Sequence, residues 1–193
     1  MDRTKQAGSV LLINKPYRWT SFNVIHKLRI KLRIKKIGHA GTLDPLATGL
    51  LIVCTHGMTK KIADFMGMEK EYTGSFIIGQ STPSHDLETT PTAPQDITHI
   101  DVSQIEAAIK NFVGIIMQTP PMHSAIKVEG TRAYDLARAG KEIALTPREV
   151  EVKSFEITQV KLPEVNFRIV CSKGTYIRSL VRDVGNALGV GAY

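Results

Sequence analysis

The stretch GHAGTLDPLATG, residues 38–49, places one carboxylate, Asp44, in a glycine-rich turn whose only basic residue is His39. A carboxylate that is held by the amides of a tight turn keeps one direction and stays ionised, so it can act as a nucleophile or a base. Pro45 stiffens the next step of the chain, because its ring fixes φ and it has no N–H. The residues alone leave two interpretations open: a reactive carboxylate, or a structural turn of the Asx type.

Other chemistries have no visible motif in this chain. The turn contains neither the GxxxxGK[ST] of a phosphate-binding loop nor the GxGxxG of a dinucleotide-binding fold, and HExxH, GxSxG and DxDxDG do not occur. The two cysteines, Cys54 and Cys171, are far apart and belong to no CxxC pair. This usage argues against a zinc site or a disulfide framework and predicts a reducing, cytoplasmic location.

The charge balance predicts a polyanionic partner. The 193 residues include 25 Lys and Arg against 18 Asp and Glu, a net charge of +7, and no apolar run is long enough to cross a membrane. The segment 27–36, KLRIKLRIKK, fits both a strand and a helix, and we predict a helix to about Leu32 with a short extended end. A solvated surface and a phosphate-binding role both remain open for its basic face, which comprises Lys27, Arg29, Lys31, Arg33, Lys35 and Lys36.

The wider pattern predicts an α+β (mixed α/β) fold with a large, mostly antiparallel sheet flanked by helices. The predicted strands are residues 9–14, 50–54, 70–79, 148–157 and 165–172. The predicted helices begin at Thr20-Ser21 and cover 58–66, 101–114 and 175–188. Residues 81–99 lack periodicity and predict a surface loop, and residues 118–143 predict an arm beside the main sheet.

The glycine-rich turn resembles the signature of the TruB family, bacterial tRNA pseudouridine synthases that modify a uridine of the T-loop. Four more blocks resemble family motifs, in the family's order: LLINKPYRWTSFNV, KEYTGSFIIGQSTPSHDLE, PPMHSAIKVEGTRAYDLARAG and CSKGTYIRSLVRDVGNALGVGAY. The resemblance covers nearly the whole chain. It implies one pseudouridine-synthase catalytic domain over residues 1–193, with 118–143 as a thumb-like insertion that clamps RNA.

The resemblance also implies the roles of the site residues. Asp44 matches the catalytic aspartate, which attacks either uracil C6 or ribose C1′; the sequence leaves both open. Tyr72 matches the tyrosine that stacks on the flipped base, and Tyr176 lines the base pocket. Arg178 matches the arginine that pairs with the aspartate, so that the carboxylate stays charged and keeps its direction. His39 matches the histidine that contacts RNA near the position which the base has left.

The implied reaction breaks an N-glycosidic bond and joins the same base through carbon, so we expect no cofactor and no metal. Base flipping costs a few kcal/mol, which stacking and phosphate contacts offset. The expected partner is the T-arm of tRNA, and we expect a monomer. Lys15 is expected to support the turn from beside it, without a catalytic role.

Three features depart from the family's pattern. Arg18 stands where the family usually has glycine, and Pro83 replaces an acidic residue. The chain stops at GAY, where the family continues with a last core strand and often a PUA-type domain, so we expect a chain truncated at its C-terminus. This leaves an alternative, a catalytically impaired module that binds or folds tRNA. The archaeal and eukaryotic relatives share GTLDP, but LDPLATGLL and the arm favour a bacterial enzyme.

Overall fold

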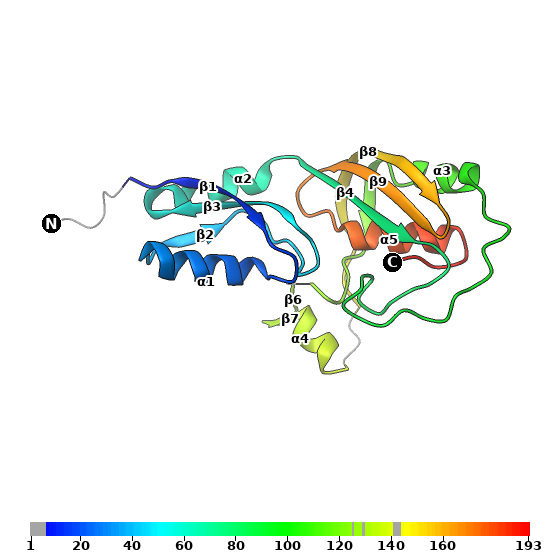
Figure 1. Ribbon diagram of the computed structural model, residues 1–193, viewed down its shortest axis with the longest axis horizontal. Helices are drawn as coiled ribbons and strands as arrows, with labels where there is room; N and C mark the ends of the chain where they lie inside the picture. Colours follow the sequence, from blue (N-terminus) through cyan, green and yellow to red (C-terminus); the bar gives the residue numbers. More distant parts are fainter. Residues whose placement is uncertain (1–6, 125, 129, 141–143) are drawn as a thin grey trace. The chain divides into compact units, whose positions relative to one another are not determined.

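The computed structural model describes residues 7–124, 126–128, 130–140 and 144–193, and its fold is a mixture of helices and antiparallel sheets, as predicted (Figure 1). The chain forms two compact units, Met1–Met68 and Glu69–Tyr193. Each unit has its own hydrophobic core and is described by itself. No helix in the described part of the chain is long and apolar enough to cross a membrane.

The first unit is a three-stranded antiparallel sheet with one main helix. Its strands are β1 (Val10–Lys15), β2 (Ile37–His39) and β3 (Gly49–Thr55), in the order β1-β3-β2. Helix α1 (Ser21–Leu32) packs its apolar side on this sheet. The buried residues of this core are Val24, Ile25, Leu51 and Val53.

Local sequence signals explain the bounds of α1. The Thr20 side chain accepts a hydrogen bond from the Asn23 backbone, and the Asn23 side chain returns one to the Thr20 backbone, which forms a capping box. The helix ends at Arg33, which adopts the left-handed conformation with φ 54°. The predicted helix to Leu32 is therefore confirmed. A helix predicted over 58–66 is instead a 3₁₀ helix (His56–Lys61) followed by α2 (Ile62–Gly67), and neither has a side-chain cap at its start.

The second unit is a four-stranded antiparallel sheet with two helices that share its core. The strand order is β4 (Lys70–Ile77), β9 (Glu164–Cys171), β8 (Arg148–Lys161) and β5 (Gly114–Gln118). The helices are α3 (Val102–Lys110) and α5 (Ile177–Ala187), drawn with the sheet in Figure 1, and their buried apolar residues share one core with the aromatic residues of the sheet. These aromatic residues are Phe76, Phe155 and Phe167.

Two strands differ from the sequence-based prediction. The predicted helix over 101–114 ends at Lys110, and β5 begins at Gly114, whose φ of 100° is easy only for glycine. β2 has only three residues, too few for a periodic signal. The loop predicted over 81–99 is confirmed, since it contains no helix or strand.

The predicted arm, residues 118–143, is a short hairpin and a short helix. It contains β6 (Lys127–Val128), β7 (Thr131–Arg132) and α4 (Ala133–Arg138). Residues 125, 129 and 141–143 of this segment lie outside the described residues.

Candidate active site

The loop that joins β2 to β3 carries Asp44, and a neighbouring helix fixes it. The Ser21 side chain, at the start of α1, accepts a hydrogen bond from the Leu43 N–H at 3.0 Å and donates one to the Leu43 carbonyl at 3.3 Å. The Ala47 N–H donates to the Asp44 carbonyl at 3.1 Å, which closes a turn around the aspartate. The backbone on both sides of the half-buried Asp44 is therefore fixed in one short turn.

Lys15 is a buried cation beside this turn. Lys15 is 0% exposed, and its ammonium donates hydrogen bonds to three carbonyls, those of Pro16 (3.0 Å), Trp19 (2.5 Å) and Pro45 (3.2 Å). All three ammonium protons are thus used, and the third bond confirms that Lys15 supports the turn. Burial lowers the pKa of Lys15, and attraction to the Asp44 carboxylate partly offsets this shift.

His39 ends β2 and contacts the same loop. Its Nδ1 lies within hydrogen-bond distance of the Gly41 carbonyl. Since a carbonyl only accepts, Nδ1 is the donor in this contact. Gly41 has φ 105°, which lets the loop turn back toward the histidine. Asp44 and His39 therefore belong to one hydrogen-bonded loop of the first unit.

The other three predicted site residues belong to the second unit. Tyr176 is the N-cap residue of α5, and the buried Gln118 side chain holds its backbone on both sides. The Tyr176 N–H donates to Gln118 Oε1 at 2.8 Å, and Gln118 Nε2 donates to the Tyr176 carbonyl at 3.0 Å. Tyr72 lies on β4 opposite Ile169 of β9 and packs half-buried against the core. The sequence reasoning missed Gln118.

Arg178, in the first turn of α5, is held by groups from two loops. Its guanidinium donates to the carbonyls of Ser84 and His123, both at 3.0 Å. It also pairs with Asp86 at 3.3 Å, and the two side chains are only 13% and 15% exposed. Asp86 lies in the block KEYTGSFIIGQSTPSHDLE, but no role was predicted for it. Within its own unit Arg178 therefore has a carboxylate partner, and its predicted pairing with Asp44 stays a prediction.

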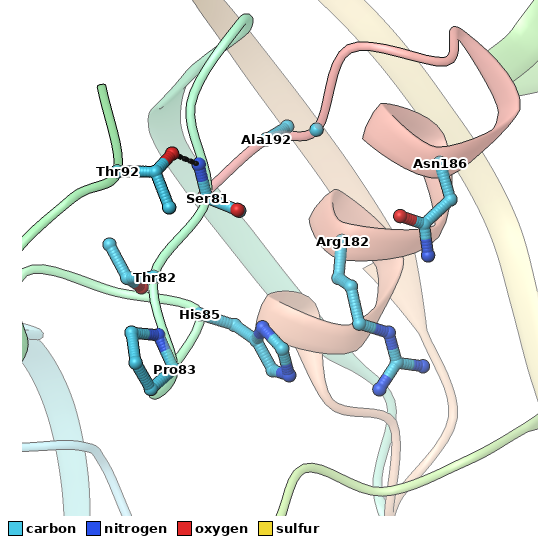
Figure 2. A pocket seen from close by; sticks show the side chains of 9 residues that line it. Ser81, Thr82, Pro83, His85, Thr92, Arg182, Asn186 and Ala192 are labelled. Carbon is cyan, nitrogen blue, oxygen red and sulfur yellow. Dashed lines mark hydrogen bonds between the residues drawn. The ribbon is translucent and has the colours of Figure 1, made fainter. Parts of the chain in front are cut away.

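A small pocket lies next to this arginine, one helical turn further along α5. It has a volume of about 400 Å³, and its lining side chains include His85 and Arg182, which lie close together in Figure 2. Burial, together with the charges of Arg182 and Arg178, lowers the pKa of His85 to about 4. His85 is therefore a neutral ring at pH 7. None of the five predicted site residues lines this pocket, so we do not assign the reaction to it.

The described residues contain no group of three or more His, Cys, Asp and Glu side chains that could hold a metal ion. The two cysteines, Cys54 and Cys171, are buried free thiols, and burial raises the pKa of both.

Comparisons with known proteins identify the family of this chain. Residues 29–177 match the model of the TruB family pseudouridylate synthase N-terminal domain. The tRNA pseudouridine synthase B of Flavobacterium johnsoniae is 51% identical, and the alignment covers 96% of this chain and 84% of the relative. The enzyme of the same name from Parabacteroides distasonis is 49% identical, over 97% of this chain and 82% of the relative.

Solved structures show the same fold. A chain of the crystal structure of a Cbf5-Nop10-Gar1 complex is 29% identical, with a TM-score of 0.73 over 95% of this chain and 45% of that chain. A chain of an H/ACA RNP bound to a substrate RNA containing 2′-deoxyuridine is 27% identical, with a TM-score of 0.68. The family match spans more than half of the chain, and it includes the Asp44 loop, Tyr72 and Tyr176. The chain therefore belongs to the TruB family of pseudouridylate synthases, which are isomerase enzymes.

Proposed function

We propose that the chain converts uridine to pseudouridine at position 55, in the T-loop of tRNA, with Asp44 as its catalytic residue. The observation that carries this proposal is the carboxylate's setting: a half-buried aspartate in a turn that Ser21 ties down and a buried ammonium braces. A structural Asx turn needs no such cation. The curated relatives named tRNA pseudouridine synthase B support tRNA as the substrate.

In the proposed reaction the enzyme flips the target nucleotide out of its loop. Asp44 attacks uracil C6 or ribose C1′, and the bond between C1′ and N1 breaks. The base then turns and a bond forms between C1′ and C5. The bond to Asp44 breaks and returns the free carboxylate, the C5 hydrogen leaves as a proton, and N1 takes up a proton. Nothing is oxidised or reduced overall, so the reaction itself calls for no redox cofactor. The protein's contribution is orientation and electrostatics, which a fixed and charged carboxylate provides.

The remaining residues act on the RNA in this proposal. Tyr72 stacks on the flipped base and Tyr176 lines its pocket, since an aromatic ring offsets part of the lost stacking energy. Arg178 pairs with Asp44 in the complex, and His39 contacts the RNA at the vacated position. The segment 118–143 is proposed to clamp the T-arm. The enzyme is proposed to act as a monomer in the cytoplasm, where its two cysteines stay reduced.

Tritium release from a tRNA transcript labelled at uracil C5 tests the proposal, because each turnover expels one C5 hydrogen. We expect release with this chain, loss of at least a thousandfold with Asp44→Asn, and no loss with Asp64→Asn, an exposed aspartate of the same unit. A transcript with cytidine at position 55 should release nothing. Release from that transcript would refute position 55 as the target, and release by Asp44→Asn would refute the catalytic role of Asp44. Binding without release would favour a function limited to tRNA binding.

A further inference from the structure

One face of helix α1 combines exposed aromatic and apolar groups with a high density of cations. Phe22, His26 and Ile30 are four residues apart, so they follow one another along a single line of the helix. Phe22 is 65% exposed and Ile30 63% exposed. The rings of Phe22 and His26 are stacked, with centroids 6.3 Å apart and an interplanar angle of 20°.

Cations flank this line on both sides. Helix geometry places Arg29 along one side of the line and Lys27 and Lys31 along the other, and Arg33 is the C-cap residue that ends the helix. All four are exposed. We name the seven residues the α1 ridge: Phe22, His26, Lys27, Arg29, Ile30, Lys31 and Arg33.

No carboxylate in the described part of the chain pairs with the cations of the ridge. No acidic residue occurs between Arg3 and Leu43 in the sequence. A surface helix that only faces solvent usually interleaves charges of both signs, and it has no need for an exposed aromatic stack.

The ridge begins at the catalytic loop. Ser21, the residue before Phe22, is hydrogen-bonded to both backbone groups of Leu43, next to Asp44. From this point α1 extends for 12 residues, which is about 18 Å. A polyanion whose reacting nucleotide lies at Asp44 would therefore have the ridge within its reach.

We propose that the α1 ridge binds the substrate RNA outside the reaction site, with its aromatic pair stacking on an unpaired base and its four cations contacting phosphates. This proposal rests on the proposed function, which makes RNA the substrate. A protein partner would use the apolar groups but would leave the four cations without a matching charge. Unstacked bases in RNA loops are usual partners for aromatic side chains flanked by Arg and Lys. The ridge sets affinity for the RNA, and Asp44 performs the chemistry.

Binding of a tRNA transcript, measured by fluorescence anisotropy over a range of salt concentrations, tests the two parts of the ridge separately. In the double variant Lys27→Ala, Lys31→Ala, the negative slope of log Kobs against log salt should become shallower by about 1.4 to 1.8, because each phosphate contact contributes about 0.7 to 0.9 to its magnitude. The control is Lys110→Ala, Lys161→Ala, which removes the same charge from exposed positions of the second unit. Its slope should stay within about 0.3 of the unaltered chain.

Phe22→Ala should weaken binding at least about fivefold at every salt concentration and leave the slope unchanged, since stacking is not electrostatic. Phe22→Tyr keeps a π-face and should stay within about twofold. In the tritium-release assay, the lysine pair variant and Phe22→Ala should both raise the KM for tRNA and retain most of kcat. An unchanged slope in the lysine pair, an equal loss in the control pair, or unchanged affinity in Phe22→Ala would overturn the proposal.

The same measurements separate this proposal from the one it rests on. If the unaltered chain releases no tritium but the ridge variants still lose RNA affinity, the catalytic function fails and the ridge stands. If the unaltered chain turns over and the ridge variants bind RNA as it does, the ridge fails and the function stands.

Discussion

Lys15 offers the sharpest test of how the Asp44 loop is held. Methionine at this position keeps a long unbranched chain but removes the ammonium. In the folded protein the carbonyls of Pro16, Trp19 and Pro45 would each lose a charged donor. The Asp44 carboxylate would also lose the nearby positive charge that attracts it.

The size of the effect follows from these contacts. A buried carbonyl without a partner costs about 1–3 kcal/mol, so three carbonyls give about 3–9 kcal/mol at most. Two terms reduce this sum: methionine carries no charge to desolvate, and water reaches part of the half-buried loop. We therefore expect Lys15→Met to lower the free energy of unfolding of the first unit by about 2–4 kcal/mol.

The chain has a built-in probe for this measurement. Its single tryptophan, Trp19, lies in the first unit and is itself an acceptor for Lys15, so its fluorescence during urea unfolding reports on that unit. Lys60→Met is the matched control, since Lys60 is an exposed lysine of the same unit. The single-turnover rate of Lys15→Met should also fall at least about tenfold, because a carboxylate that moves loses its alignment.

One result would refute this reasoning. If Lys15→Met unfolds within about 0.5 kcal/mol of Lys60→Met and retains its rate, the three hydrogen bonds do not hold the loop. A loss of stability without a loss of rate would mean that Lys15 contributes to the stability of the fold but not to the reaction.

Three further predictions concern other charged or strained groups. Asp86→Asn should lower the free energy of unfolding by about 2–3 kcal/mol and slow turnover, because it leaves the largely buried Arg178 guanidinium without this carboxylate. The pKa of His85 is about 4 in the folded chain and near 6.5 in the unfolded chain, so between these pH values only the unfolded chain binds a proton at His85. The free energy of unfolding should therefore drop by roughly 2 kcal/mol between pH 7 and pH 4. His85→Gln should remove this drop. Arg18 has φ 63°, so Arg18→Gly should change stability by less than about 1 kcal/mol, whereas Arg18→Val should lower it by about 1–2 kcal/mol in thermal unfolding.

Each of these predictions has its own contradicting outcome. Equal stability of Asp86→Asn and the unaltered chain in urea would mean that the carbonyls of Ser84 and His123 suffice to hold Arg178. A pH profile of His85→Gln that matches the unaltered chain would assign the acid sensitivity to other groups. Equal melting temperatures for the glycine and valine variants would show that the turn at Arg18 is not strained.

Local sequence signals were enough to predict much of the fold. The capping residues and apolar spacing of α1 predicted a helix to Leu32, and the alternation along 165–172 predicted a half-buried strand. Both signals depend on residues a few positions apart. β5 was not predicted, because the predicted helix covers 101–114 and so includes Gly114. In the structure this glycine has a positive φ and marks the start of the strand. The glycine-rich turn and its single aspartate could also be recognised, because their residues are only a few positions apart.

Short motifs with fixed spacing in the sequence were enough to identify the family and to predict the catalytic carboxylate and the two aromatic candidates. The groups that hold these residues in place became visible only in the folded chain. Lys15 reaches a carbonyl 30 residues away, Gln118 holds Tyr176 from 58 residues away, and Asp86, in the loop after β4, pairs with Arg178 of α5. Such partners leave no periodic trace in the sequence, since a hydrogen bond or ion pair between distant segments forms only after the chain has folded and its burial has excluded water.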